Sequence, residues 1–375
     1  MKNFMIISLM VLSVFTANRS LAQAPPNFHN STDWNVKPSL KYDALCLINI
    51  LTGDPFYVQY YEKEYEEFSK KITPEVKPVL EKLLQIKQST GIVLSAGMCL
   101  YYSAVPDSTL DQLIETTRDL SVLKQNFSKT IYYNETEWGM FEMLQGDLRT
   151  CFMFLKEAGF EAYWEENNLP KIEQRIDELQ AGFSTNDYNL ISVQEKLLGF
   201  PLQDNTIEVN MIYYARPHGM KITGTEFITD VAYDFNTVIH NAGHEMMHPP
   251  YDYAANTTLQ QSLESLKSDT FLMDKVQNHD PKFGYNDFEG YIEENCVRAL
   301  DQMVSEEIGL SEGAKDRFKN SDGGMHVFAN ALYQVMKEEN FNNNEELFSD
   351  FLIRVISEGK FEQGSIKNYY DAIAP

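Results

Sequence analysis

Residues 238–252 read VIHNAGHEMMHPPYD, a stretch with three histidines, one glutamate and two adjacent prolines. His244, Glu245 and His248 form the pattern HExxH within it. On an α-helix, residues four positions apart lie one above the other on the same face, so both imidazoles can reach one cation. The stretch therefore predicts a helix that carries part of a metal site.

Zinc is the metal that this pattern favours. It accepts neutral imidazole nitrogen, prefers four ligands, and in catalytic sites keeps one position open for water. Glu245 stands beside the first ligand and can accept a proton from that water. We therefore expect one Zn²⁺ ion held by His244 and His248, with Glu245 as the general base.

His240 complicates the assignment, because it is also four positions from His244. That pair would leave Glu245 without the role that its position fits, so we interpret His240 as a packed histidine or one that supports a ligand from behind. The proline pair after His248 should end the helix at that histidine, since proline lacks the N–H that a helix needs. A third protein ligand must then come from a separate element.

The segment DFEGYIEENCVRALDQMVSEEIG, residues 287–309, is the main source of candidates for that ligand. Its spacing predicts a helix with one apolar face, which Glu293 flanks, whereas Glu294 lies on the far side in a polar stripe with Arg298 and Asp301. Periodicity slightly prefers Glu293, and without the HExxH helix the stripe would be interpreted as a solvated face. The candidates downstream of the HExxH helix are His279, Asp280, Glu289, Glu293, Glu294 and His326.

A strand, an HExxH helix and a later helix with a glutamate, spread over roughly residues 206–305, resemble the gluzincin (thermolysin-like) class of zinc metallopeptidases. The register of that class selects Glu294 as the third ligand, with Glu293 as the alternative. Two features depart from it: the 46 positions from His248 to Glu294 make a long gap, and Arg298 replaces an aspartate that many members carry. The carboxylate that usually supports a ligand histidine must then come from elsewhere.

The resemblance implies a zinc-dependent peptidase that acts on a peptide or protein substrate. A strand within residues 220–228 would pair with the extended substrate, as edge strands do. A hydrogen-bond donor must also stabilise the transition state. The candidates for this donor are His326, Tyr291 and Tyr333.

Two other functions compete with this interpretation. A di-iron carboxylate site would need a second ExxH motif on another helix, and we find none. An exported, non-catalytic binding or scaffold protein with a peptidase-like fold is the alternative from a different class. The intact Glu245 argues against it, because a purely structural metal site needs no base.

The first residues predict export. Lys2 precedes the apolar run FMIISLMVLSVF, and a small-residue site at residues 20–22 gives an expected mature start at Gln23. The run is too short to span a bilayer, so we expect a cleaved signal peptide over residues 1–22 and a periplasmic or secreted, bacterial protein. The formal charge is −24, and loss of Lys2 and Arg19 would make it −26. Such an acidic surface disfavours nucleic acid and membrane partners.

The overall prediction is an α+β fold, with a mainly helical N-terminal region over residues 23–200 and a zincin-like domain over residues 201–375. In the latter, the alternation in TIEVNMIYY predicts a strand, MKITGTEFITDVAY predicts one or two more, and Asp234 can cap the HExxH helix. The cysteines lie among apolar neighbours, so we expect buried free thiols, with Cys46–Cys99 as the pair to consider for a disulfide. The four cysteines are Cys46, Cys99, Cys151 and Cys296.

Overall fold

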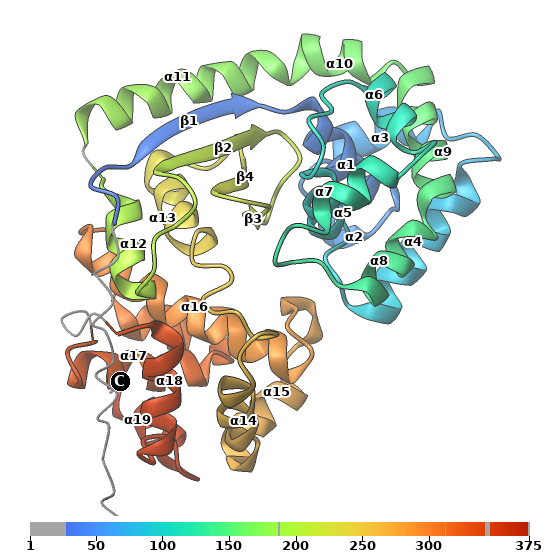
Figure 1. The fold of residues 1–375 in the computed structure, drawn as a ribbon. Coiled ribbons are helices and arrows are strands. Elements are labelled where there is room, and N and C mark those ends of the chain that lie inside the picture. Colours follow the sequence, from blue (N-terminus) through green and yellow to red (C-terminus); the bar gives the residue numbers. More distant parts are fainter. Residues whose placement is uncertain (1–27, 187, 312, 342–345, 374–375) are drawn as a thin grey trace, which may run out of the picture.

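The computed structural model describes residues 28–186, 188–311, 313–341 and 346–373. The expected signal peptide and mature start lie outside the described residues. Within them the fold is α+β, with many helices arranged around one four-stranded sheet (Figure 1). The predicted fold class is confirmed at this level.

The sheet contains strands from both sides of the domain boundary expected at residue 200. Its order is β1-β2-β4-β3, with β1 and β4 parallel to β2, and β3 antiparallel to β4. The strand expected in TIEVNMIYY is β2, and the one or two strands expected after it are two, β3 and β4. Strand β1 lies in the region interpreted as mainly helical. The strands are β1 Asp33–Pro38, β2 Thr206–Ile212, β3 Met220–Lys221 and β4 Glu226–Asp230.

Strand β2 is buried on both faces, as is typical of a parallel strand with covering helices. Ile207, Val209 and Met211 are fully buried, and so is Asn210 on the opposite face. Helix α11 (Leu169–Thr185) runs along β1, and α13 (Phe235–Glu245) lies beside β4 (Figure 1). The sheet thereby fixes the start of the helix that carries the histidines.

The N-terminal region is helical, as expected, apart from β1. Helices α2 and α3 are separate elements, and α4 is followed by Gly91, which is left-handed at φ 71°. The helices are α1 Leu40–Leu51, α2 Pro55–Val58, α3 Glu62–Ser69, α4 Lys77–Thr90, α5 Leu94–Tyr102, α6 Leu110–Thr116, α7 Ser121–Phe127, α8 Glu135–Glu142, α9 Gln145–Glu157, α10 Phe160–Asn167, α11 and α12 Leu190–Leu198.

Buried aspartates connect these helices to the sheet. Asp43 on α1 accepts hydrogen bonds from the backbone N–H groups of Tyr213 and Tyr214 at 2.7 and 2.9 Å, just beyond β2. Asp230, at the end of β4, accepts one from the Tyr61 hydroxyl at 2.9 Å. With β1, these bonds join the two sides of the boundary expected at residue 200.

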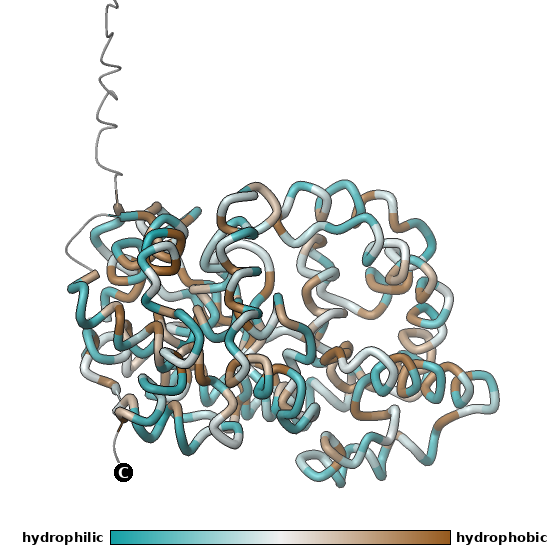
Figure 2. The backbone as a smooth tube through the Cα atoms, turned by 90° about the horizontal axis from the view of Figure 1, so that it is seen from below, coloured by the Kyte–Doolittle hydropathy of each residue, from teal (hydrophilic) through white to brown (hydrophobic). Residues whose placement is uncertain are grey.

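After β4 the chain is again helical. Along the helices, hydrophobic and hydrophilic positions follow each other closely, as Figure 2 shows. Among the described residues, no helix combines the length and the apolar character needed to cross a bilayer.

The elements that follow β4 are α13, α14 Thr257–Ser265, α15 Thr270–Asn278, α16 Phe288–Glu307, α17 Val327–Glu338, α18 Phe348–Ser357 and α19 Ser365–Ala372, with short turns at Leu266–Ser268, Pro281–Phe283, Asp316–Asn320 and Asp322–Gly324.

All four cysteines are buried free thiols. Cys46 on α1 and Cys99 on α5, the pair considered for a disulfide, are hydrogen-bonded neighbours with free thiols. The hydrogen bond with Cys99, together with burial, raises the pKa of the Cys46 thiol well above its ordinary value. The expectation of buried thiols is therefore confirmed.

Candidate metal centre

Helix α13 begins as expected and ends early. Its N-cap Asp234 accepts a hydrogen bond from the Thr237 N–H at 2.8 Å. The last helical residue is Glu245, so the prediction that the helix continues to His248 is wrong. The proline pair ends the helix three residues earlier than expected, because neither proline supplies an N–H to the carbonyls of the preceding turn.

His248 reaches the site from a tight turn instead of from the helix. Its N–H donates to the Glu245 carbonyl at 3.2 Å, one residue after the Met247 N–H donates to the His244 carbonyl at 3.0 Å. This turn folds the chain back, so the Nε2 atoms of His244 and His248 lie 3.3 Å apart. The two imidazoles converge although only one of them lies on the helix.

Helix α16 faces α13 with a buried carboxylate. The side chain of Glu294 is 1% exposed and that of Asp301 is fully buried. Since α16 packs against both α13 and α17, its polar stripe faces protein and not water. The stripe is therefore not a solvated helix face, which is how it would be interpreted without the HExxH helix.

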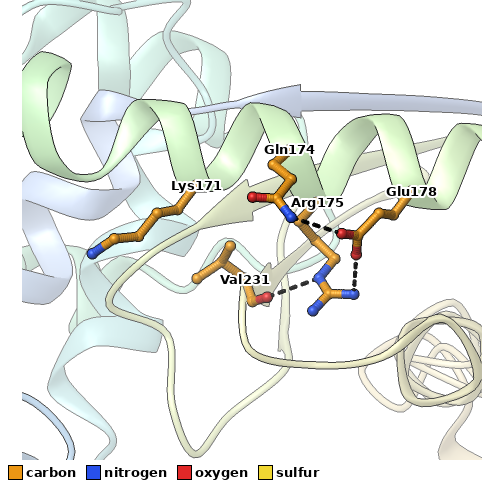
Figure 3. Close-up of a pocket in the computed structure, with 5 residues that line it drawn as sticks. All are labelled: Lys171, Gln174, Arg175, Glu178 and Val231. Carbon is orange, nitrogen blue, oxygen red and sulfur yellow. Dashed lines mark hydrogen bonds and ion pairs between the residues drawn. The ribbon is translucent and has the colours of Figure 1, made fainter.

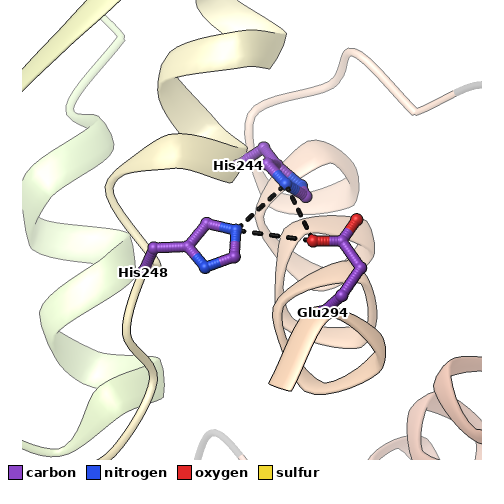
Figure 4. Close-up of side chains that lie close together, drawn as sticks. All are labelled: His244, His248 and Glu294. Carbon is purple, nitrogen blue, oxygen red and sulfur yellow. Dashed lines mark hydrogen bonds and ion pairs between the residues drawn. The ribbon is translucent and has the colours of Figure 1, made fainter. Parts of the chain in front are cut away.

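The three side chains form a compact triangle (Figure 4). Glu294 Oε2 lies 3.6 Å from His244 Nε2 and 3.5 Å from His248 Nε2. At zinc–ligand distances of about 2.0–2.1 Å, neighbouring corners of a tetrahedron lie about 3.3–3.4 Å apart. The three atoms therefore have the mutual spacing that a tetrahedral zinc ion requires of three ligands.

One oxygen of Glu294 is held and the other is not. Oε1 accepts a hydrogen bond from Arg298 Nε at 2.6 Å, and Arg298 is itself paired with Asp322 at 2.8 Å. Oε2 is buried without a hydrogen-bond partner, although it points at the two imidazoles. Burial alone would raise the pKa of Glu294, but His244 and Arg298 hold it well below its ordinary value. The carboxylate is thus ionised, with its free oxygen directed into the triangle.

A carboxylate stands behind each histidine. His244 Nδ1 lies 3.2 Å from Asp301 Oδ2, and His248 Nδ1 lies 3.3 Å from Glu293 Oε1. Glu293 therefore lies behind His248 and does not belong to the triangle of His244, His248 and Glu294. Asp301, seven residues after Glu294, supplies the support that Arg298 cannot give.

These contacts surround the two imidazoles with the carboxylates of Asp301, Glu293 and Glu294, so the centre of the triangle favours a positive charge. If both Nδ1 hydrogens are directed at carboxylates, both Nε2 lone pairs face Glu294 Oε2 with no donor between them. Burial lowers the pKa of both imidazoles, but the surrounding carboxylates outweigh it and raise the pKa of His244 to about 10 and of His248 to about 9. The cluster therefore requires a cation, either protons or a metal ion.

Glu245 lies beside the triangle and outside it. It is 8% exposed, and its Oε1 is 3.0 Å from where a Cβ would lie on Gly219, the residue before β3. Lys221 on β3 is close enough for Glu245 to act on its pKa, which burial lowers to about 8. The carboxylate thus faces the edge strand of the sheet.

The expected transition-state donors do not face the triangle. His326 is 1% exposed, with Nε2 3.1 Å from Asp322 Oδ2. The Tyr291 hydroxyl donates to the Met325 carbonyl, and the Tyr333 hydroxyl donates to Glu306. His326 is connected to Glu294 through Asp322 and Arg298.

The remaining candidates lie elsewhere as well. His240 is 3.0 Å from Arg317 Nη1 and 3.3 Å from the Ser305 hydroxyl, in the packed position expected for it. The nitrogens of His279 lie 2.9 and 2.8 Å from the carbonyls of Lys275 and Gly284. Among the described residues, only His244, His248 and Glu294 form a group that could hold a metal, so neither Asp280 nor Glu289 joins one.

Two tyrosines near the site were missed in the sequence. Tyr285 is 37% exposed, but desolvation of its hydroxyl raises its pKa above the ordinary value, and the carboxylates of Glu294 and Glu245 raise it further. The Tyr132 hydroxyl donates to the His248 carbonyl at 3.2 Å. Neither tyrosine belongs to a motif, and both reach the site only through tertiary folding.

A separate surface pocket shares no residue with the triangle (Figure 3). Its Arg175 donates to the Val231 carbonyl at 3.0 Å and pairs with Glu178 at 2.5 Å, so these polar groups are already satisfied. The lining residues are Lys171, Gln174, Arg175, Glu178 and Val231. We find no chemistry in this pocket that competes with the triangle.

Comparison of the chain with protein-family models, with curated proteins and with solved structures finds no match. The site is therefore interpreted from its own geometry.

Proposed function

We propose that this chain is a zinc-dependent peptidase with a zincin-like catalytic region. His244, His248 and Glu294 would hold one zinc ion, and Glu245 would act as the general base. The observation that carries the proposal is the unpartnered, buried Oε2 of Glu294, which lies 3.5 and 3.6 Å from two imidazole nitrogens. On that side the ionised oxygen faces the two imidazoles, so either protons on their nitrogens or a metal ion would neutralise it.

The residues around the triangle have distinct tasks in this proposal. Zinc, when bound, would activate water as a nucleophile and polarise the scissile carbonyl. Glu245 would take the proton from the attacking water and pass it to the leaving amine. Asp301 and Glu293 would hold the imidazoles with Nε2 facing inward, and Arg298 would keep Glu294 ionised.

The position of β3 supports a peptide as the substrate. β3 is the edge strand of the sheet, and Gly219 directly before it lies against Glu245. An extended peptide that paired with the outer side of this strand would bring its backbone to the base. The short strand would thus align the scissile bond with the metal.

Tyr285 is the residue that we propose as the transition-state donor, in place of His326, Tyr291 and Tyr333. A phenol is protonated at neutral pH, and that of Tyr285 lies close enough to Glu294 and Glu245 for both carboxylates to act on its pKa. A neutral hydroxyl beside the base can donate to the oxygen that becomes negative as water attacks.

We also propose that the protein is exported, because the N-terminal sequence has the pattern of a cleaved signal peptide. N-terminal sequencing of protein recovered outside the cytoplasm should begin at Gln23. Recovery of the intact N-terminus from the cytoplasm alone would contradict this localisation.

The function is tested with the purified protein by measuring bound metals and hydrolysis of a labelled unstructured protein. We expect about one zinc per chain in the wild type and in Glu245→Gln, with hydrolysis at least 100-fold slower in Glu245→Gln. Glu165→Gln, on the exposed side of α10, is the matched control and should behave as the wild type.

The outcomes separate the two competing functions. Zinc with equal hydrolysis rates in wild type and Glu245→Gln would remove the catalytic role and favour a non-catalytic binding protein with a structural metal. Absence of any bound divalent metal after incubation with excess zinc would contradict the metal site itself.

A further inference from the structure

His248 has an unusual backbone position for a ligand. Helix α13 ends at Glu245, so the His248 carbonyl lies beyond the ordinary helical hydrogen bonds. The next two residues are prolines, which have no N–H to donate. A carbonyl in this place needs a donor from another part of the chain.

Tyr132 is that donor. Its hydroxyl donates to the His248 carbonyl at 3.2 Å across a separation of 116 positions. Tyr132 lies in the connection between α7 and α8, in the helical N-terminal region that carries none of the proposed ligands. The N-terminal region therefore touches the metal centre at the backbone of one ligand.

A second contact holds the ring of the same histidine. Glu293 Oε1 lies 3.3 Å from His248 Nδ1, behind the imidazole. Tyr132 and Glu293 thus hold His248 from two directions, one through its backbone and one through its ring.

The two histidines differ in how they are held. His244 lies within α13 and has the fully buried Asp301 behind it. His248 lies in a turn, and the Glu293 side chain behind it is 34% exposed. His248 is therefore the ligand whose position depends most on an additional contact.

We propose that Tyr132 is a positioning residue of the metal centre, and that the N-terminal helical region completes the site by fixing the second histidine ligand. The proposal rests on the proposed zinc site and extends it. It gives the N-terminal region a role that its own sequence does not reveal.

The test compares Tyr132→Phe with Tyr133→Phe in the complete protein. Both changes remove one hydroxyl from the same connection and keep the ring, but the Tyr133 hydroxyl is bonded to the exposed Glu135. Zinc affinity is measured by competition with a chromophoric chelator, zinc release by stopped flow, and the Tm of the metal-free chains by calorimetry. We expect zinc affinity about tenfold weaker and release faster in Tyr132→Phe, with no change in Tyr133→Phe.

The metal-free Tm distinguishes positioning from ordinary packing. If Tyr132→Phe has the wild-type Tm without metal but gains less from added zinc, the positioning role is supported. Wild-type affinity in Tyr132→Phe, or a loss of metal-free stability that accounts for the whole change, overturns it. If the wild type binds no zinc, the proposed function itself fails, which is a different result from an unchanged Tyr132→Phe.

Discussion

At the scale of single residues, Glu293 and Glu294 are adjacent in the sequence but occupy different layers of the site. Glu294 directs a free oxygen at both imidazoles, whereas Glu293 contacts the outer nitrogen of His248. We expect Glu294→Gln to abolish stable zinc binding, since an amide is a weak zinc ligand. Glu293→Gln should keep the stoichiometry and lose about 10-fold in affinity.

Mass spectrometry of metals after dialysis checks this prediction, with chelator competition for the affinities. The comparison is direct because the two substitutions are isosteric and lie on the same helix. If Glu293→Gln loses zinc and Glu294→Gln retains it, then Glu293 and not Glu294 is the third ligand.

Gly219 provides a second prediction at this scale. A Cβ there would lie 3.0 Å from Glu245 Oε1 and 3.4 Å from Asn241 Nδ2, closer than ordinary contact. Gly219→Ala should displace the carboxylate of the base by a few tenths of an ångström and leave the ligands in place. We expect kcat to fall about tenfold with unchanged zinc content, because small displacements of reacting groups are costly.

Kinetics and metal analysis of Gly219→Ala check this result together. Gly243→Ala is the control glycine, because a Cβ there would lie 3.5 Å or more from its neighbours, Asp301 and Val304. Equal kcat in Gly219→Ala and the wild type would show that Glu245 is not confined by β3.

The sequence was most informative about residues that share a local motif. His244, Glu245 and His248 follow from one spacing rule, and Glu294 follows from the register of a resembling class. Asp301, Tyr132 and Tyr285 could not be found in this way, because their contacts depend on how separate segments pack.

At the scale of elements, the cap of α13 positions the chemistry. Asp234 accepts from the Thr237 N–H at 2.8 Å and so fixes the first turn of the helix that ends at Glu245. We expect Asp234→Ala to lower the free energy of unfolding by about 1 kcal/mol, the usual cost of a lost cap. Chemical denaturation measures this, and Asp234→Asn, which can still accept the bond, should retain most of the stability.

A loss in Asp234→Asn as large as that in Asp234→Ala would show that the negative charge, and not the cap, provides the stabilisation.

Element boundaries were predictable where a local signal exists. Gly91 ends α4 in the left-handed conformation, and the alternation of Ile207, Val209 and Met211 marks β2. The end of α13 was predicted too late. The rule used was that a helix ends at the residue before a proline, whereas two successive prolines leave carbonyls of the preceding turn without N–H donors.

At the scale of the whole molecule, the sheet shows why the organisation was only partly predictable. β1 pairs with β2 in parallel, with Trp34 opposite Ile207. No pattern within residues 33–38 states that a partner lies more than 160 positions away. The helical content was predictable from local patterns, whereas the connection between the N-terminal helices and the elements that carry His244, His248 and Glu294 was not.

The same N-terminal packing predicts how the molecule responds to acid. His218 follows β2 and meets α2, where the Tyr57 hydroxyl lies 3.0 Å from its Nε2. Burial, with a smaller effect of Lys87, lowers the pKa of His218 to about 4, from an ordinary value of about 6.5 in the unfolded chain. Between these pH values the unfolded chain binds a proton that the folded chain does not.

Stability must therefore fall as the pH decreases from about 6.5 to about 4, and this contribution is constant outside that window. We expect this contribution of His218 to lower the free energy of unfolding by about 1–3 kcal/mol. This range lies below the full conversion of the pKa shift, because the half-buried ring is partly screened by water. Burial also lowers the pKa of His326 to about 4, so the wild-type curve contains a similar contribution from a second histidine.

His218→Gln isolates the first contribution, since glutamine carries no proton in this range. The free energy of unfolding is measured with urea for wild type and His218→Gln at pH 7.5, 6.5, 5.5 and 4.5. The two values should converge as the pH falls, because protonation of the unfolded histidine at this position destabilises only the wild type. Two parallel curves over the whole range would mean that the folded protein protonates His218 as readily as the unfolded chain does, and that the contact between the sheet and α2 is open to water.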